Sequence, residues 1–304
     1  MTGTAENPGF RLPNFEILGL LGRGGMASVW KARQLSLDRF VAIKVLSPQF
    51  ASTAEDIRQF RTEAQTAARL KHPNIVEVYD ANFSDGFYYF VMELVDGYTM
   101  GELLHRKGDM PVEDAMVIAE SVAVALDYAW SFHKMVHCDI KPDNIMADAD
   151  GTVKVTDLGL CRTLALIKES DEKETDEILG TPAYMSPEQI YGDTTIDCRS
   201  DIYSLGASIY HLITGYTLFQ GLDSDAMMRA HVGNVQSPDP REFAPAVKPA
   251  VVMMLERMLA KRPEQRFRDW AHVLAEIKRI QDGKIVWASP MLPFSSSIKR
   301  DGGR

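Results

Sequence analysis

Alternating apolar and polar residues dominate the first third of the chain, a pattern typical of half-buried strands. Five short stretches have this pattern or a short apolar run between turn residues, and we expect them to be strands: residues 15–21, 27–32, 40–46, 75–79 and 87–94. Residues 53–70, rich in Ala, Arg, Glu and Gln, favour a helix. This third is therefore expected to be a mainly antiparallel sheet with one helix.

Beyond about residue 96, the spacing of the apolar residues becomes helical. Residues 112–132 show it most clearly, with apolar side chains at Met116, Ala119, Val122, Ala123, Leu126 and Ala129. Further helices are expected at 202–213, 225–231, 248–260 and 270–280. The pattern as a whole predicts an α+β fold with a small, mainly β lobe and a larger, mainly helical lobe.

The domain boundary is predicted at the hinge Val95-Asp96-Gly97, where the pattern changes. A chain of 304 residues is long enough to bury a sizeable core in one large domain or in two lobes. The expected organisation is a flexible lead-in (1–13), a first lobe (14–95), a second lobe (96–281) and a mobile tail rich in Gly, Ser and Pro (282–304).

The net charge of the chain bears on whether nucleic acid is a binding partner. The net charge is −9 and the pI is about 5.3, which argues against binding nucleic acid, because that needs a basic face. Apolar residues make up 45% of the chain and charged residues 25%, as in ordinary soluble globular proteins.

The cysteines and the apolar runs indicate a cytoplasmic location. Cys138, Cys161 and Cys198 lack metal-ligand or redox spacing and are expected to be free thiols in a reducing cytosol. No apolar run reaches the roughly 18 residues of a membrane segment, and the N-terminus lacks the pattern of a signal peptide. The chain could equally be the cytosolic catalytic part of a longer membrane protein.

A polar loop between apolar flanks, residues 136–146, carries three groups suited to phosphoryl transfer. Asp139 can accept a proton from an attacking hydroxyl, and Lys141 can neutralise charge on the moving group. Asn144 can offer an oxygen to a metal ion, and Asp157, thirteen residues further on, is a second candidate metal ligand.

Two features of the strand region suit a nucleotide. The glycine cluster at 22–29 would let the backbone approach phosphates, although an ordinary hairpin turn explains it as well. Lys44 lies in a strand whose neighbours indicate burial, and a buried lysine needs a partner. The alternative is a strand lysine that faces solvent.

Together these motifs resemble the protein kinases, in the family's order and spacing from about residue 15 to 280. Lys141, two residues after Asp139, is similar to serine/threonine kinases rather than tyrosine kinases. The glycine cluster and the segment 180–188 look most like the bacterial, eukaryotic-like (Hanks-type) branch. The resemblance implies a two-lobed fold that binds ATP and Mg²⁺, or Mn²⁺, between its lobes and acts in signal transduction.

The resemblance also implies the reaction and its residues. The acceptors would be Ser or Thr hydroxyls of proteins, including the chain's own. Asp139 would orient and deprotonate the hydroxyl, while Lys141 would stabilise the transferring phosphoryl group. Asn144 and Asp157 would hold the metal.

For the nucleotide, the resemblance implies that Lys44 holds the phosphates and is oriented by Glu63 of the expected helix. The other residues implied at the nucleotide lie on the glycine cluster, the neighbouring strands and the hinge: Leu21, Gly22, Arg23, Gly24, Gly25, Met26, Ala27, Val29, Ala42, Met92, Glu93, Val95 and Met146. For the apolar residues that would enclose the adenine ring, plain core packing is an equally good explanation.

Two implied roles are supporting ones. Glu188, at the end of the segment that would receive the substrate, is expected to pair with Arg266. Asp201 is expected to hold the loop at 136–146 by hydrogen bonds.

The chain departs from the family pattern at Ala27, Cys138, Leu158 and Ser186. Cys138 replaces an arginine that grips a phosphate on the activation loop in many kinases. The segment 169–177 of that loop holds six acids and one lysine, so an added phosphate would meet like charge, although a solvated charge run is the simpler interpretation. We hypothesise that basal activity depends little on phosphorylation of this loop, and, more weakly, that the acids favour basic residues in the substrate.

Two functions of other classes are the alternatives. A nucleotide-binding pseudokinase or regulatory scaffold would be expected to lack Lys44, Asp139, Asn144 or Asp157, yet all four are present. A phosphotransferase for small molecules would share a related fold, but the segment 180–188 and the helices after it favour protein substrates.

Overall fold

The computed structural model describes residues 9–24, 27–47, 58, 67–157, 181–284 and 297–299. The chain forms two compact units, Met1–Asp96 and Gly97–Arg304. The division falls within the hinge where the sequence places the boundary between the lobes. Each unit is described by itself below.

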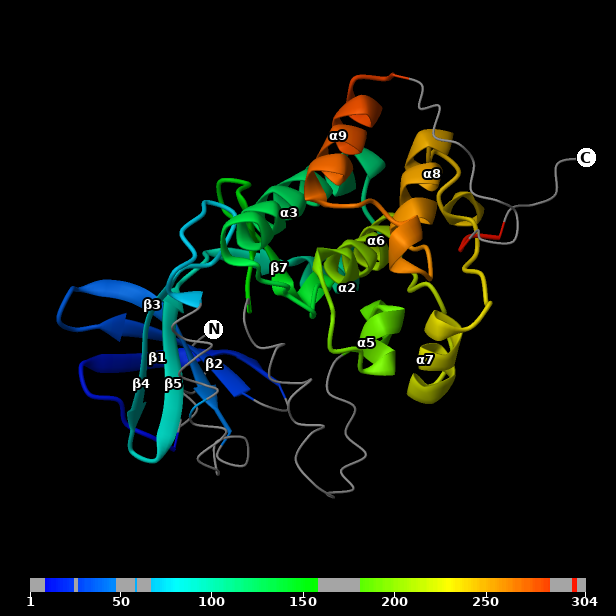
Figure 1. The fold of residues 1–304 in the computed structure, drawn as a ribbon. Helices are drawn as coiled ribbons and strands as arrows, with labels where there is room; N and C mark the ends of the chain where they lie inside the picture. Colours follow the sequence, from blue (N-terminus) through cyan, green and yellow to red (C-terminus); the bar gives the residue numbers. More distant parts are fainter. Residues whose placement is uncertain are drawn as a thin grey trace, which may run out of the picture. The chain divides into compact units, whose positions relative to one another are not determined.

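The first unit is built on an antiparallel sheet of five strands in the order β1-β2-β3-β5-β4 (Figure 1). The strands are β1 (Phe15–Arg23), β2 (Ala27–Gln34), β3 (Arg39–Leu46), β4 (Val78–Ser84) and β5 (Phe87–Glu93). The core on the sheet consists mainly of aromatic and β-branched side chains, including Phe10, Trp30, Val41, Ile43, Tyr89 and Val91.

Two predictions for the first unit need comment. The strand expected at 75–79 begins only at Val78, because Ile75 closes a turn, its N–H donating to His72 O at 3.0 Å. Ile75 and Val76 are buried although they precede the strand, so their apolar side chains reflect a place in the core and not strand structure. Most of the helix expected at 53–70 lies outside the described residues.

The second unit opens with a small antiparallel sheet that the sequence analysis did not predict. Its strands, in the order β6-β7-β8, are β6 (Gly97–Thr99), β7 (Ile145–Asp148) and β8 (Val153–Val155). Gly97 is required here, since a Cβ atom would lie 1.8 Å from Ala147 O on the paired strand. Helix α2 (Met100–Lys107) follows directly, with Thr99 and Glu102 forming a capping box.

The rest of the second unit is mainly helical, as predicted, where the structure describes it. The helices in this part are α3 (Val112–His133), α5 (Pro187–Tyr191), α6 (Cys198–Thr214), α7 (Ser224–Val232), α8 (Pro249–Met258) and α9 (Trp270–Gln281). Short 3₁₀ turns lie at η2 (Pro142–Asn144), η3 (Pro182–Tyr184), η4 (Pro240–Glu242) and η5 (Pro263–Gln265). Helix α6 begins four residues before the expected start because Asp197 caps it, accepting a hydrogen bond from Arg199 N–H.

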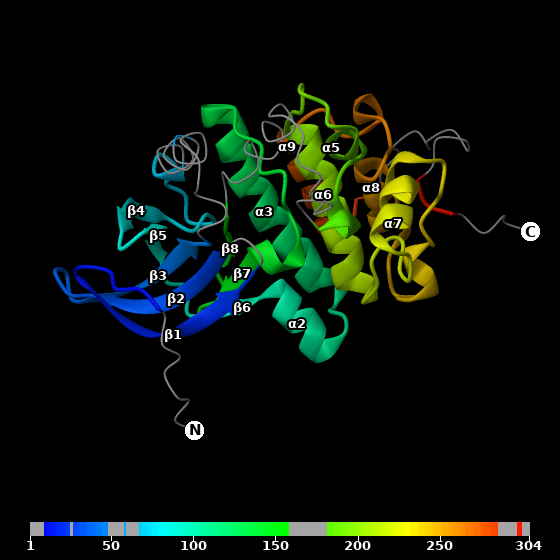
Figure 2. The same cartoon turned by 90° about the horizontal axis from the view of Figure 1, so that it is seen from below.

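Helix α3 is the central helix of this unit. It packs against α6 and α9, and Figures 1 and 2 both show these helices side by side. By length and composition alone it is apolar enough to cross a membrane, the one such helix among the described residues. However, its small apolar side chains, such as Ala115, Ala119 and Ala123, are completely buried in the folded unit, which accounts for its hydropathy.

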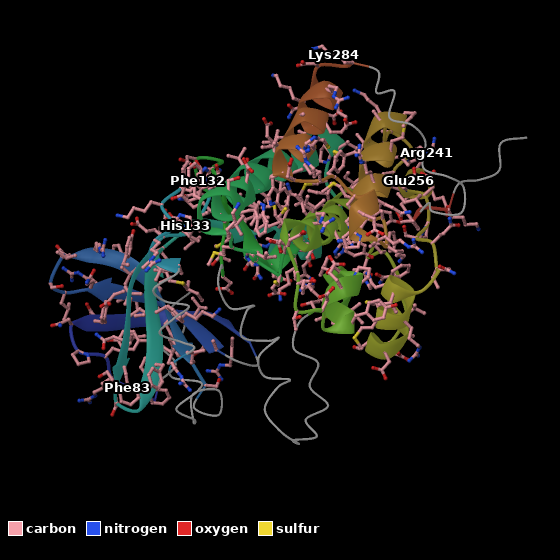
Figure 3. All side chains as sticks on the ribbon, viewed as in Figure 1. Phe83, Phe132, His133, Arg241, Glu256 and Lys284 are labelled. Carbon is pink, nitrogen blue, oxygen red and sulfur yellow. The ribbon has the colours of Figure 1, made fainter. Side chains whose placement is uncertain are left out.

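Residues 297–299, part of the tail expected to be mobile, are packed into the second unit instead. Ile298 is completely buried and forms a parallel bridge with Ser237. Ser297 Oγ donates to the carbonyl oxygen of Glu256, a residue of α8 labelled in Figure 3, at 2.9 Å. Burial, the bridge and this hydrogen bond hold these three residues against the second unit.

Candidate active site

The polar loop expected to carry the chemistry connects α3 to β7. Its backbone turns at Cys138, whose φ of 59° lies in the left-handed region that non-glycine residues rarely adopt. Both carboxylate oxygens of Asp201, on α6, hold this turn. Oδ2 accepts from His137 N–H at 2.6 Å and Oδ1 accepts from Cys138 N–H at 2.7 Å. The hydrogen bonds expected of Asp201 are thus present.

The environment of Asp201 is almost dry, with only 1% of the residue exposed. Burial raises the pKa of Asp201 to about 6, and the nearby His137 and the two backbone donors act in the opposite direction. The loop therefore rests on a carboxylate that is costly to bury and is stabilised by the backbone that it holds.

His137 fixes the loop from a second direction and is fully buried. Its Nδ1 accepts from Asp139 N–H at 3.2 Å, while its Nε2 lies 2.9 Å from Thr156 O. A carbonyl oxygen can only accept, so these two bonds assign the ring hydrogen to Nε2. The ring thereby ties Asp139 to the residue that precedes Asp157.

Two polar side chains predicted at the site, those of Lys141 and Asn144, meet at the carboxylate of a third, Asp139. Lys141 Nζ lies 2.9 Å from Asp139 Oδ2, and Asn144 Nδ2 donates to the same oxygen at 2.8 Å. Lys141 Nζ also donates to Thr181 Oγ1 at 3.1 Å. The side chains of Asp139 and Lys141 are 29% and 18% exposed, so this ion pair is open to incoming groups. Thr181 was not predicted at this position, because only the fold brings it to a residue 40 positions earlier.

The candidate metal ligands lie at one end of the β7–β8 hairpin. Thr156 N–H donates to Asn144 O at 3.0 Å, and Asp157 follows directly, with a φ of 62°. Asn144 Nδ2 donates both of its hydrogens to Asp139, one to the backbone oxygen at 2.7 Å and one to the side chain. The amide oxygen of Asn144 is therefore the atom left for a cation. An amide oxygen and a carboxylate suit Mg²⁺ or Mn²⁺.

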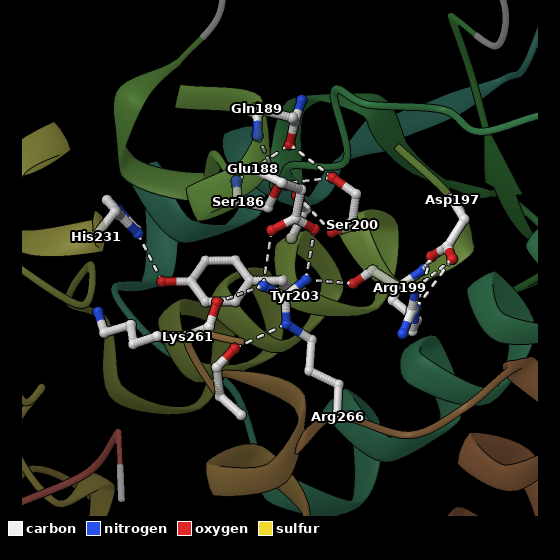
Figure 4. Close-up of polar contacts among 12 residues, drawn as sticks. Ser186, Glu188, Gln189, Asp197, Arg199, Ser200, Tyr203, His231, Lys261 and Arg266 are labelled. Carbon is white, nitrogen blue, oxygen red and sulfur yellow. Dashed lines mark hydrogen bonds and ion pairs between the residues drawn. The ribbon is translucent and has the colours of Figure 1, made fainter. Parts of the chain in front are cut away.

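A buried ion pair joins Glu188 of α5 to Arg266, the residue after η5 (Figure 4). Arg266 holds Glu188 through two hydrogen bonds, from Nη1 to Oε1 at 2.6 Å and from Nη2 to Oε2 at 2.8 Å. The other three N–H groups of Arg266 reach carbonyl oxygens of Ala260, Arg199 and Lys261. The predicted pair is present, and all five guanidinium hydrogens have acceptors.

Gln189 is a contact of the loop that sequence reasoning missed. Its Nε2 donates to Cys138 O at 2.6 Å, linking α5 to the turn before Asp139. No local sequence pattern predicts this hydrogen bond, because the two residues are 51 positions apart.

The remaining predicted residues belong mainly to the first unit. The turn between β1 and β2 is closed by Gly24 N–H, which donates to Ala27 O at 2.9 Å. Leu21 is half exposed, whereas three of the expected adenine contacts are buried, namely Ala42, Met92 and Val95. Gly22 and Arg23 end β1, Val29 lies on β2, Glu93 ends β5, and Met146 lies on β7 of the second unit. Gly25 and Met26 lie outside the described residues.

Lys44 is buried on β3, opposite Val29 of β2 and Phe90 of β5, so the alternative of a solvent-facing lysine is wrong. Its expected partner Glu63 lies outside the described residues, as do Leu158, Cys161 and the acidic segment 169–177. The predicted site residues are thus divided between the two units, and the cluster around Asp139 belongs wholly to the second.

Comparisons with known proteins identify one family. The family described as "Protein kinase domain" matches residues 15–276. The chain is 37% identical over 268 residues to Serine/threonine-protein kinase PrkC of Bacillus subtilis (strain 168), covering 88% of this chain and 40% of that protein. It is 38% identical over 274 residues to Serine/threonine-protein kinase PknB of Mycobacterium leprae (strain TN), covering 89% and 43%.

Solved structures give the same result for the fold. The PknI kinase domain of Mycobacterium tuberculosis superposes with a TM-score of 0.72 at 28% identity, over 92% of this chain and 100% of that one. The chain spans about two fifths of the length of the curated relatives it matches.

Proposed function

Because the chain belongs to the protein kinase domain family, we propose that it transfers the γ-phosphoryl group of ATP to Ser and Thr hydroxyls of proteins, its own included. The names of the relatives, all serine/threonine-protein kinases, support this choice of acceptor. A cytoplasmic location accompanies the proposal, since ATP and reduced thiols are found there.

The meeting of Asp139, Lys141 and Asn144 is the observation that carries the proposal. A carboxylate open to solvent, a cation at 2.9 Å and a donor at 2.8 Å form a polar cluster on a loop whose backbone is held by a buried carboxylate. Phosphoryl transfer asks the protein mainly for positioning and for electrostatic stabilisation, and this cluster supplies both.

Each side chain then has a chemical task. Asp139 accepts the hydrogen bond of the acceptor hydroxyl and takes its proton as the new O–P bond forms. Lys141 leaves part of its contact with Asp139 to neutralise charge on the phosphoryl oxygens. Thr181, hydrogen-bonded to Lys141, keeps that ammonium close to the acceptor.

The nucleotide end rests on residues of the first unit. Lys44 supplies the buried positive charge for the phosphates, and the glycines of the segment 22–27 would let the backbone approach them. Asn144 and Asp157 would hold Mg²⁺ or Mn²⁺, which neutralises phosphate charge when it is bound.

The direct test is incubation with labelled ATP and Mg²⁺, with Asp139→Asn in parallel, followed by mapping of the phosphorylated sites. We expect label on Ser or Thr with the parent protein only. ATP binding without label on the protein itself or on a generic protein substrate would favour a pseudokinase or scaffold. Label on a small metabolite but on no protein would favour a phosphotransferase for small molecules.

We also propose that basal activity depends little on phosphorylation of the loop 169–177. Cys138 cannot form the bidentate bridge to a phosphate that arginine forms. Replacing Ser170 and Thr175 together with alanine should therefore lower the rate by less than about tenfold. A larger fall would contradict the proposal.

A further inference from the structure

Two successive peptide planes precede Asp139, and side chains hold both of them. The plane between His137 and Cys138 is fixed by Asp201, which accepts from Cys138 N–H at 2.7 Å. The plane between Cys138 and Asp139 is fixed at both ends. Its N–H donates to His137 Nδ1 at 3.2 Å, and its C=O accepts from Gln189 Nε2 at 2.6 Å. The strained φ of Cys138 persists only where such contacts determine it.

The amide of Gln189 is itself held in one orientation (Figure 4). Its Oε1 accepts from Ser186 N–H at 3.1 Å, within the capping box of α5, and from Ser200 Oγ at 3.2 Å. Ser200 Oγ also lies 2.6 Å from Ser186 Oγ. Because Oε1 faces donors and Nε2 faces a carbonyl oxygen, rotating the amide by half a turn would break bonds on both sides.

We propose that Gln189 is a positioning residue for catalysis, which orients the Asp139 carboxylate by fixing the peptide plane before it. This inference rests on the proposed function. In this chain the side chain at position 138 is a small thiol, and the turn is held through its backbone, by Asp201 from α6 and by Gln189 from α5. The hydrogen bonds of the Gln189 side chain go to Ser186, Ser200 and Cys138 rather than to Asp139 or Lys141, so it acts through the carbonyl of Cys138.

Gln189→Glu tests the bond with a change of one atom. A carboxylate cannot donate to Cys138 O, whereas a protonated carboxyl group can. We expect kcat for a peptide substrate to fall about tenfold or more near pH 8 with KM nearly unchanged, and the ratio of parent to variant kcat to narrow as the pH falls below about 6. The titratable groups that face this region, Glu188, Asp201 and His137, are common to both proteins.

Two further variants act as controls. Gln189→Met keeps the bulk but loses the donor at every pH, so its loss of kcat should not depend on pH. Gln220→Glu makes the same chemical change at an exposed residue. Its hydrogen bonds with Thr217 are accepted by Oε1, an atom that glutamate keeps, so the kcat of this variant should match that of the parent. A kcat of Gln189→Glu within about twofold of the parent at every pH, or a parent-to-variant ratio that does not change with pH, would overturn the proposal.

Hydrogen exchange provides a readout that needs no activity. In Gln189→Met, the amides of His137, Cys138 and Asp139 should exchange at least about tenfold faster than in the parent, while amides within α6 keep their rates. If exchange in Gln189→Met is unchanged while the parent is an active kinase, the positioning role alone is overturned. If exchange in the variant is faster but the parent has no kinase activity, Gln189 still fixes the loop and the proposed function is contradicted.

Discussion

The ion pair within the loop 136–146 and the ion pair between Glu188 and Arg266 have similar chemistry and opposite surroundings. Asp139 and Lys141 meet at 2.9 Å with side chains 29% and 18% exposed. Glu188 and Arg266 meet at 2.6 Å with side chains 10% and 0% exposed. The first pair can exchange its partners with an incoming substrate. The second has none to exchange, since every N–H of Arg266 already has an acceptor. A supporting ion pair thus differs from a reactive one in its burial and in having every N–H group already hydrogen-bonded, and not in its residue types.

Arg266→Met should have the largest effect and should act on stability. The change leaves the Glu188 carboxylate buried without its cation and removes the donors to three carbonyl oxygens. We expect the free energy of unfolding to fall by about 3–5 kcal/mol, measured by urea denaturation. Arg199→Met is the matched control, because Arg199 also holds a carboxylate, that of Asp197, but with both side chains about one-third exposed. A loss no larger than that of the control would contradict the distinction drawn here.

The stability of the protein should depend on pH through the buried carboxyl group of Asp201. Burial raises the pKa of Asp201 from its ordinary 3.8 to about 6, so the folded protein keeps this proton at pH values where the unfolded chain has lost it. The resulting stabilisation is complete below about pH 4 and is lost as the pH rises through 6, a change of about 3 kcal/mol. Unfolding of the parent and of Asp201→Asn should be compared between these values. The stability of the parent relative to the variant should fall as the pH rises, and a constant difference would disprove the assignment.

Lys141→Met makes the same kind of change as Arg266→Met, but on the open side. We expect kcat to fall about 10²-fold, near 2.7 kcal/mol of barrier, because charge on the moving phosphoryl group is no longer neutralised. Stability should change by less than about 1 kcal/mol, as is usual for a partly exposed pair. The measurement pairs steady-state kinetics with urea denaturation on one preparation. Equal losses of stability in Lys141→Met and Arg266→Met would remove the contrast between the two sides.

What the sequence could predict follows the same division. The reactive side lies within a few residues of one loop, so its groups are visible in the local pattern at Asp139, Lys141 and Asn144. The supporting side joins distant parts of the chain. Its two main contacts, Glu188 with Arg266 and Asp201 with the loop, were expected only through resemblance to a family. The bond of Gln189 to Cys138 and the burial of Ile298 have no local signature, because each depends on where the fold brings a partner more than 50 positions away.

The small β6-β7-β8 sheet shows the same limit in secondary structure. Its strands contain three or four residues each, too short for a period of two to be recognised. The start of α6 was missed because its first turn is polar, and capping by Asp197 rather than apolar spacing determines where it begins. The longer elements, such as β3, β5 and α3, were predictable because their apolar faces are continuous.

Gly206→Ala tests whether the packing of α6 on α8 keeps Asp201 in place. Its largest expected effect in free energy is smaller than that of each change above. Gly206 lies on α6, one turn beyond Asp201, and a Cβ atom there would lie 2.8 Å from Met258 Cβ on α8. Overpacking of this kind costs about 1–3 kcal/mol, and the better helix propensity of alanine offsets up to about 1 kcal/mol. We therefore expect a net loss of about 1–2 kcal/mol in thermal or urea unfolding.

The matched control for Gly206→Ala is Gly19→Ala on β1, where an added Cβ meets nothing within 4 Å. Its stability should stay within about 0.5 kcal/mol of the parent. If α6 moves as a unit to relieve the contact with Met258, Asp201 moves with it, and kcat should fall together with stability. A loss of stability at unchanged kcat would instead show that α8 yields and that the rigid support ends at α6.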